Sequence, residues 1–210
     1  MSTLAAFPAV PGGVDLGAVY AAPAERIQKA VLDRLVDVHE DYLKVATFFC
    51  LATSGNKGLD ASPRGGPPGF VRVLDPHTVV FADWPGNNRI ESMRNLAQDE
   101  RVGMLFLFPG LDVFLRINGI ARVSAWPELL ATLAENGKTP KTATVVRASE
   151  VLFHCGKAGN RARLWPPESL VDRDKVPTPG QMMTRLTGIS KEEGAQLDTH
   201  YAHAVRHDLY

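Results

Sequence analysis

Short β-rich runs follow one another between Thr47 and Cys155, and their close spacing limits the fold more than any other feature of the chain. Strands are expected over residues 47–53, 59–64 with a continuation at 70–74 beyond a Gly/Pro break, 78–83, 101–108, 112–125, and over 142–155 as one or two strands bent near Ala148 and Ser149. Most links between them are short turns, which join antiparallel neighbours. A parallel βαβ fold needs a long crossover before each strand. The pattern therefore predicts a mainly β chain with flanking helices (α+β), built as an antiparallel barrel or sandwich.

Helical patterns flank this region and interrupt it twice. Helices are expected over residues 23–36, 40–45, 87–97 and 126–135, and the chain from Gln181 onward is predicted to form two helices divided at Gly188–Ser190. Residues 1–22 are rich in Ala, Pro and Gly and are expected to form a loose arm. The predicted organisation is an N-terminal arm (1–22), a barrel domain (23–170) and a C-terminal helical extension (171–210).

The charge balance limits the class of partner. The 210 residues carry 23 basic and 23 acidic side chains, which argues against a general nucleic-acid binder because such affinity depends on excess positive charge. No apolar run is long enough to cross a bilayer, and the first residues lack the pattern of a signal peptide. Two cysteines outside any zinc-binding spacing indicate free thiols and no metal site. We therefore expect a cytoplasmic protein that binds neither nucleic acid nor membrane.

Ser62 and Arg64 are the first candidate ligand-binding residues. They lie two residues apart, on one face of an expected strand, just before the loop Gly65–Gly69. A guanidinium beside a hydroxyl can contact a phosphate or the polar edge of a planar ring. The alternative is that Arg64 is a surface charge beside a turn.

Gly86, Asn87, Asn88 and Arg89 come directly before a predicted helix. Backbone N–H groups at a helix start, together with a guanidinium, form an anion site. Asn87, Asn88 and Arg89 are therefore candidates for holding a phosphate near the Ser62/Arg64 strand. The simpler alternative is that the asparagines only cap the helix.

Basic and aromatic residues also gather later in the chain. Arg116 lies on the polar face of the expected strand 112–125, and Lys157, Arg163 and Trp165 follow the last strand. Trp165 could stack on a planar ring, and the positive groups could stabilise a reduced, anionic flavin. The alternative is a solvated basic helix whose Trp fills an apolar seam.

Two common catalytic arrangements are absent from the sequence. Ser62 is not part of a G-x-S-x-G turn, and His154 and Cys155, as adjacent strand residues, point to opposite faces. The loop Gly65–Gly69 is not G-x-G-x-x-G, and its prolines lack the N–H groups that bind a dinucleotide. Acyl transfer and Rossmann-type binding are therefore set aside.

Jointly, these stretches carry a resemblance to a known family. The chain resembles the pyridoxamine 5′-phosphate oxidase-like, FMN-binding split-barrel proteins, and in particular a branch of PPOX-class FMN-dependent enzymes. The resemblance covers roughly residues 25–170. It rests on Ala61–Gly65, Pro68–Val71, Pro85–Arg89, Pro109–Gly110, Leu115–Gly119, His154–Cys155, Lys157 and Leu164–Trp165.

The resemblance implies an FMN-binding split β-barrel of about six antiparallel strands, and a homodimer with two FMN sites at the subunit interface. By analogy, Ser62 and Arg64 lie along the ribityl-phosphate. Asn88 and Arg89, with Asn87, hold the phosphate, and Phe81 and Asp83 border the ring. Arg116 and the segment that contains Lys157, Arg163 and Trp165 complete the cofactor site, the segment coming from the partner chain.

The chain also departs from true pyridoxamine-phosphate oxidases. It lacks the lysine that follows their strand arginine, a glutamine near Phe114, and the arginine motif after Trp165. These differences put vitamin B6 oxidation in doubt and leave flavin binding in place. The predicted function is an FMN-dependent oxidoreductase that acts on an unidentified small molecule by hydride transfer. No general acid or base is assigned, although His154 and Arg116 are candidates. The alternatives are a non-catalytic flavin binder or sensor, and the same barrel holding deazaflavin or haem.

Overall fold

The computed structural model describes residues 13–86 and 88–209. By its internal contacts the chain forms two compact units, residues 1–30 and 31–210. The first contains two short helices, α1 (Leu16–Val19) and α2 (Glu25–Lys29), whose residues are all exposed. The predicted helix over 23–36 is therefore too long. It ends early because Leu32 exchanges two backbone hydrogen bonds with Val151, so this residue is held as an extended bridge on the sheet of the second unit.

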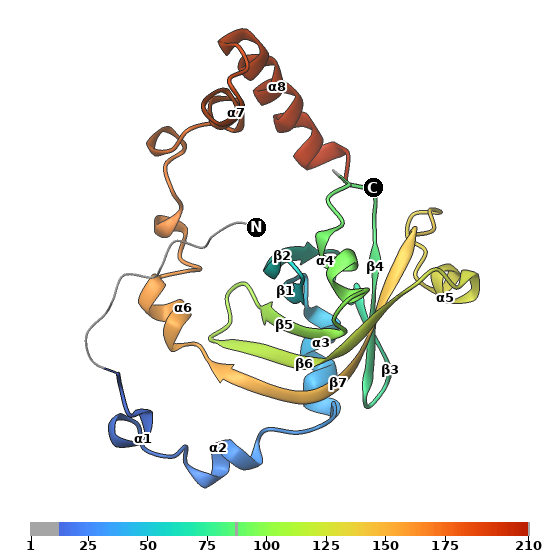
Figure 1. The fold of residues 1–210 in the computed structure, drawn as a ribbon, viewed down its shortest axis with the longest axis vertical. Helices are drawn as coiled ribbons and strands as arrows, with labels where there is room; N and C mark the ends of the chain where they lie inside the picture. The colour runs from blue at the N-terminus through green and yellow to red at the C-terminus, as the bar shows by residue number, and fades with distance from the viewer. Residues whose placement is uncertain (1–12, 87, 210) are drawn as a thin grey trace. The chain divides into compact units, whose positions relative to one another are not determined.

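Seven antiparallel strands form the sheet of the second unit (Figure 1). They are β1 (Phe48–Gly55), β2 (Gly58–Gly65), β3 (Val71–Asp75), β4 (Thr78–Asp83), β5 (Arg101–Leu107), β6 (Val113–Ser124) and β7 (Thr142–Cys155). Their order across the sheet is β2-β1-β5-β6-β7-β4-β3. The α+β class and the antiparallel arrangement are confirmed. The two runs on either side of the Gly/Pro break, expected as one interrupted strand, are the two outermost strands of the sheet.

The core lies on one face of these strands and is rich in phenylalanine. The ring of Phe49 lies at the centre, with centroid distances of 4.9 Å to Phe106 and 5.1 Å to Phe81. Helix α3 (Asp37–Val45) buries Leu43 and His39, and Leu43 belongs to the same core cluster. Burial of each phenylalanine and of Leu43 stabilises the fold by about 1.5–3 kcal/mol relative to full exposure of the side chain.

Strand β7 carries one extra residue against β6. Asn118 pairs with Glu150 and Gly119 with Ala148, so Ser149 is left out of the pairing. The bulge lies where the bend was expected, near Ala148 and Ser149, and residues 142–155 form one strand rather than two. A Cβ on Gly119 would lie 2.0 Å from the Arg147 carbonyl oxygen. Glycine at 119 therefore lets the two backbones approach at the bulge.

Two short helices pack on the sheet, and one of them, α4, contributes to the cavity described below. Helix α4 (Glu91–Leu96) is tied to the β1–β2 hairpin, because Ser92 donates to Asp60 and Asn95 to Thr53. Helix α5 (Pro127–Thr132) packs Leu130 in a second, smaller core. Helix α6 (Lys157–Ala162) follows β7, and the 3₁₀ turns η1 (Pro167–Ser169) and η2 (Arg173–Lys175) come after it.

The C-terminal helices pair with each other. Helices α7 (Pro179–Thr187) and α8 (Lys191–His207) meet closely at Gly180 and Gly194, where a Cβ on Gly180 would lie 1.9 Å from the Gly194 oxygen. Thr178 and Ser190 begin the two helices as side-chain caps. The expected pair of helices divided at Gly188–Ser190 is confirmed. Among the described residues, no helix is both long and apolar enough to span a bilayer.

Candidate functional site

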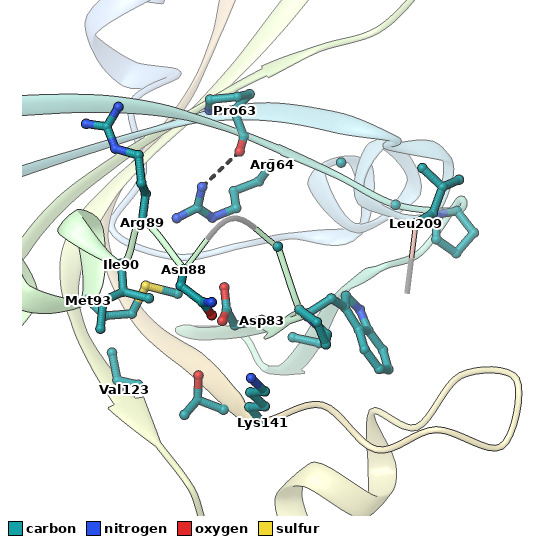
Figure 2. Close-up of a pocket in the computed structure, with 18 residues that line it drawn as sticks. Pro63, Arg64, Asp83, Asn88, Arg89, Ile90, Met93, Val123, Lys141 and Leu209 are labelled. Carbon is teal, nitrogen blue, oxygen red and sulfur yellow. Dashed lines mark hydrogen bonds between the residues drawn. The ribbon is translucent and has the colours of Figure 1, made fainter. Parts of the chain in front are cut away.

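A cavity of about 1000 Å³ opens where β2 and β4 end (Figure 2). Its polar lining includes Arg64 from β2, Asp83 from β4, Arg89 from the loop after β4, and Lys141 and Thr142 at the start of β7. Its apolar lining includes Trp84, Ile90, Met93 and Val123. Pairing of β4 with β7 places Asp83 opposite Thr142 and so beside Lys141. A concave apolar site with a few convergent charges is typical of small-molecule binding.

Arg64 is the half-buried cation of this cavity. Its Nη1 donates to Ser62 Oγ and, at 2.8 Å, to the Pro63 carbonyl oxygen. Its Nε is buried and has no hydrogen-bond partner among the described residues. Burial lowers the pKa of the guanidinium, while Asp83 and Asp60 oppose that shift. A buried donor without an acceptor raises the free energy of the folded protein. This N–H is therefore suited to bind a ligand that carries an anionic group or a carbonyl.

Asp83 faces two cations across the cavity. Burial raises the pKa of its carboxyl, and the charges of Arg64 and Lys141 act in the opposite direction. Because burial is the larger effect, the carboxylate is less stable here than in water. The net charge of the cavity wall is nevertheless positive, since Arg64, Arg89 and Lys141 outnumber Asp83.

The loop between β4 and α4 differs from its prediction. Helix α4 begins at Glu91, later than the expected start at residue 87, and its N-cap is Ile90, with no side-chain cap. Asn88 therefore does not cap it. This residue instead adopts a left-handed backbone with φ 59°, a conformation that Asn tolerates better than most residues. Asn87 lies outside the described residues. An anion site here must rest on side chains, because the helix is too short to provide one alone.

A second, smaller cavity of about 410 Å³ adjoins the first. It is lined by residues 60–64 of β2 and by Arg89, Glu91 and Ser92. Pro63, Arg64 and Arg89 line both cavities. Ser62 belongs to the smaller cavity, so the structure brings the Ser62/Arg64 strand and the Arg89 loop together as predicted. Arg89 pairs with Glu91, with 3.4 Å between its Nε and Glu91 Oε1, and its side chain is largely exposed.

Phe81 and Arg116 lie away from both cavities. Phe81 is a fully buried core residue, so its ring packs on Phe49 while its neighbours Ala82 and Asp83 line the larger cavity. Arg116 is half-buried on β6, and its Nη2 donates to Glu150 Oε1 at 2.7 Å. Its Nε is buried without a partner among the described residues. Burial and the charge of Arg116 lower the pKa of the nearby His154.

The segment after β7 also lies outside the two cavities within one chain. Lys157 is exposed at the first position of α6. Arg163 has a left-handed backbone and pairs with Glu168 at 2.7 Å. Trp165 donates from Nε1 to the Leu111 carbonyl oxygen at 3.2 Å. The assignment of these three residues to a cofactor site therefore requires a second chain and stays a prediction.

Sequence reasoning missed several lining residues. Trp84 and Met93 lie on either side of the Pro85–Arg89 motif in the sequence. Their closeness to Asn88 and Arg89 could have indicated that they line the same site. Lys141 and Val123 reach the cavity only through the long-range pairing of β6 with β7 and of β7 with β4. No local pattern in the sequence indicates that pairing.

The comparison with protein families covers more than half of the chain. Residues 35–155 match the family model described as pyridoxamine 5′-phosphate oxidase. This range contains the seven strands β1–β7 and the cavity-lining residues from Asp60 to Thr142. The chain belongs to the pyridoxamine 5′-phosphate oxidase family. This family is one of flavin-binding proteins and includes oxidoreductases. The resemblance seen in the sequence is thereby confirmed, as is the split-barrel fold.

Solved structures with a similar fold are distant in sequence. HupZ of Group A Streptococcus is 15% identical with a TM-score of 0.45, over 56% of this chain and 92% of that chain. A putative pyridoxamine 5′-phosphate oxidase from Lactobacillus delbrueckii is 19% identical with a TM-score of 0.44, over 58% and 95%. The FAD binding protein from Mycobacterium smegmatis is 16% identical with a TM-score of 0.40, over 59% and 97%. No curated protein matches the chain in sequence.

Proposed function

We propose that this member of the family binds a flavin by its 5′-phosphate in the larger cavity and acts as a flavin-dependent oxidoreductase on a small molecule. FMN is the smallest cofactor that carries both the ring and the phosphate. The observation that carries the proposal is the Nε of Arg64, which is buried and has no hydrogen-bond partner among the described residues. It lies in a cavity wall whose described residues have a net positive charge. An anion there supplies the missing acceptor and offsets the burial of the guanidinium.

The residues of the cavity fit a flavin 5′-phosphate. Arg64 and Arg89, with Ser62, would hold the phosphate at the wall that the two cavities share. Arginine suits this role because its planar fork can bind two phosphate oxygens. Trp84, Met93 and Val123 offer apolar surface for a planar ring.

A bound flavin supplies two-electron redox chemistry at its N5. The chain's own contribution is to bind the tail, exclude water from the ring and place charge beside it. Lys141 is the cation of the cavity that is not needed at the phosphate, and Asp83 is the carboxyl beside it. We assign no general acid or base among the described residues.

A homodimer is part of the proposal, and the sheet face away from the core supports it. We call the row Cys50, Leu105, Arg116 and Leu152 the outer row, since these residues lie opposite one another on neighbouring strands. Leu105, in the middle of the sheet, is 39% exposed, and Phe48 at the end of β1 is 37% exposed. A second copy covering this face would bury these exposed apolar groups.

The compartment we propose is the cytoplasm. Cys50 and Cys155, the two cysteines of the chain, are both free thiols. Free thiols are typical of a reducing compartment.

Flavin binding is tested by titrating protein freed of cofactor with FMN and riboflavin, following flavin fluorescence. FMN is expected to bind more tightly than riboflavin, because only FMN carries the phosphate. Arg64→Met should weaken FMN binding by about 1.5–3 kcal/mol, roughly 10- to 150-fold, and leave riboflavin affinity nearly unchanged. Arg147→Met, on an exposed residue that lines neither cavity, is the matched control. Equal affinity for FMN and riboflavin would exclude a phosphate site.

Turnover separates an enzyme from a flavin binder or sensor. An oxidoreductase oxidises NADH or NADPH with an electron acceptor faster than the same concentration of free FMN does. A rate equal to that of free FMN would favour the non-catalytic alternative. The absorbance spectrum of the purified protein distinguishes flavin from haem.

A further inference from the structure

The larger cavity contains a carboxyl close to the place where the proposed function puts an anion. Asp83 is the last residue of β4 and Arg64 lies near the end of β2, and both line the cavity. Figure 2 shows the Asp83 carboxyl between the Arg64 guanidinium and Lys141. The charges of both cations act on this carboxyl, so the three groups form one electrostatic cluster.

Asp83 acts on Arg64 through its charge and not through a hydrogen bond. The Nη1 of Arg64 donates to Ser62 Oγ and to the Pro63 carbonyl oxygen, and its Nε is buried with no partner among the described residues. Burial lowers the pKa of Arg64, and the charge of Asp83 is the largest effect that opposes this shift. In the protein without cofactor, Asp83 is therefore the counter-ion of a guanidinium that still has an N–H available to a ligand.

A phosphate at Arg64 would bring a second negative charge to the same guanidinium. Burial already disfavours the ionised form of Asp83 and raises the pKa of its carboxyl. A neighbouring phosphate adds to this effect, because it repels the carboxylate and offsets the charge of Arg64. The repulsion is relieved when one carboxyl oxygen of Asp83 takes up a proton from the solvent.

Other charged groups lie around the same anion site. Among the described residues of the larger cavity these are the cations Arg89 and Lys141. The adjoining smaller cavity adds two carboxyls, Asp60 and Glu91. A phosphate would act on these two carboxyls as well, so only a variant at Asp83 isolates the share of that residue.

We propose that Asp83 is the resident counter-ion of the anion site and a specificity-determining residue: a phosphate-bearing flavin competes with its carboxylate for Arg64, and binding of the phosphate is coupled to uptake of a proton by Asp83. This inference rests on the proposed function and adds regulation by pH to the same site. Because the ionised carboxyl opposes only the phosphate, it lowers the affinity for FMN and leaves the affinity for riboflavin unchanged.

The test titrates cofactor-free wild type, Asp83→Asn and Asp41→Asn with FMN and with riboflavin, at fixed ionic strength and at pH values from about 4 to about 8. At neutral pH, Asp83→Asn should bind FMN about three- to tenfold more tightly than wild type, as expected for removal of one unit charge near a phosphate, and riboflavin equally well. Asp41→Asn, on an exposed residue of α3 that lines neither cavity, is the matched control and should show no such gain.

The pH dependence carries the sign of the coupling. The gain of Asp83→Asn should be fully present above the pKa of Asp83 in the complex. It should disappear as the pH falls toward the pKa in the free protein, which burial holds above 3.8. Protonation of the FMN phosphate affects both proteins at each pH, so their ratio of affinities reports on Asp83.

Calorimetry of FMN binding in buffers of different ionisation enthalpy counts the protons directly. Where Asp83 titrates, wild type should take up more protons than Asp83→Asn at the same pH, by a fraction of one proton per site. Contributions from the phosphate and from Asp60 and Glu91 are common to both proteins and cancel in the difference.

The outcomes separate the inference from the function on which it rests. If Asp83→Asn leaves FMN affinity and proton uptake unchanged, or weakens the binding of both flavins, Asp83 does not compete with the phosphate and the inference is wrong, while a preference for FMN over riboflavin still supports the phosphate site. If wild type does not distinguish FMN from riboflavin at any pH, the proposed function fails and the inference with it. Asp83→Ala serves the same comparisons if Asp83→Asn does not fold.

Discussion

Arg64 lies directly opposite Phe49 in the pairing of β1 and β2. Because cross-strand partners point to the same face of a sheet, a guanidinium shares its face with a fully buried ring of the core. The charge lies at the rim of that core, where the sheet ends on β2 and the cavity begins. At this position a charged side chain that lines the cavity replaces an apolar side chain of the core.

Arg64→Met should therefore stabilise the protein that lacks cofactor, or leave it unchanged. Replacing a buried charge by an apolar side chain of similar length removes the burial cost and the unpartnered Nε. We expect a gain of about 0–2 kcal/mol in the free energy of unfolding, measured by urea denaturation, together with the loss of FMN affinity. A clear loss of stability would mean that the bonds to Ser62 and Pro63 outweigh the burial cost.

Asp83→Asn should stabilise the protein at neutral pH and not in acid. Burial raises the pKa of Asp83 in the folded state above its ordinary value of 3.8. The folded state therefore binds the proton more tightly, and the stability that this carboxyl contributes is present below pH 3.8 and is lost as the pH rises through the folded pKa. Urea midpoints at several pH values should show the advantage of the Asn variant growing from acid to neutral pH. A variant less stable than wild type at neutral pH would show that the attraction to Arg64 and Lys141 dominates.

His39 should give the opposite sign of pH dependence. Burial lowers the pKa of this side chain in α3, and its Nδ1 accepts a hydrogen bond from the Val36 N–H at 3.2 Å. Stability is fully present above the ordinary pKa of 6.5 and decreases as the pH falls through it toward the lower folded value. The pKa of His154 is also lowered, so His39→Gln should remove part of the loss and a further His154→Gln more of it. An unchanged pH profile in both variants would contradict this account.

Glu150→Ala should destabilise the sheet more than Glu150→Gln does. The Glu150 carboxylate accepts from Arg116 at 2.7 Å and from Asn118 Nδ2 at 2.8 Å. Alanine leaves both donors on the outer face without this acceptor, at a cost of about 0.5–1.5 kcal/mol for these partly exposed groups, whereas a glutamine oxygen can still accept. Thermal unfolding of the two variants measures the difference, and equal effects would show that solvent replaces the carboxylate freely.

Leu105→Glu should convert a dimer to a monomer. Leu105 lies in the middle of the outer row, where a charge in a covered interface would be left without a partner. Light scattering coupled to size-exclusion chromatography should give twice the chain mass for wild type and the single mass for the variant. Leu74→Glu, on the exposed edge strand β3, is the control. A wild-type protein of single mass would remove the homodimer from the proposal.

Much of the fold was predictable from local pattern. In residues 112–125, Leu115, Ile117 and Ala121 share one face of the strand and are buried, while Arg116, Asn118 and Arg122 lie on the other face. Alternation with period two depends only on the pleat, so sequence alone reveals it. The helix boundaries were less predictable: α2 ends at Lys29 and α4 begins only at Glu91, without a side-chain cap to mark its start.

The site was predictable only where its residues are close in sequence. Ser62 with Arg64, and Asn88 with Arg89, were recognised from their own stretches. Their meeting depends on the β2–β1 and β4–β7 pairings, and Lys141 enters the cavity by the same route.

Phe81 shows the limit of reasoning from strand parity. Phe81 and Asp83 are two residues apart and share one face of β4, yet Phe81 is fully buried in the core and Asp83 lies in the cavity wall. Their environments differ because the core ends between them, at the point where β4 ends. Parity predicts the face of a residue, but the extent of the core along a strand depends on what packs against it.

The strands β2 and β3 are consecutive along the chain but lie at opposite ends of the strand order. No ladder of hydrogen bonds joins them in that order of described strands, and the short linker through Gly66–Phe70 connects them. A ligand could therefore pass beside this linker without breaking any hydrogen bond between paired strands. If the proposed flavin binds here, its exchange is expected to depend on the motion of that linker and to be much faster than global unfolding.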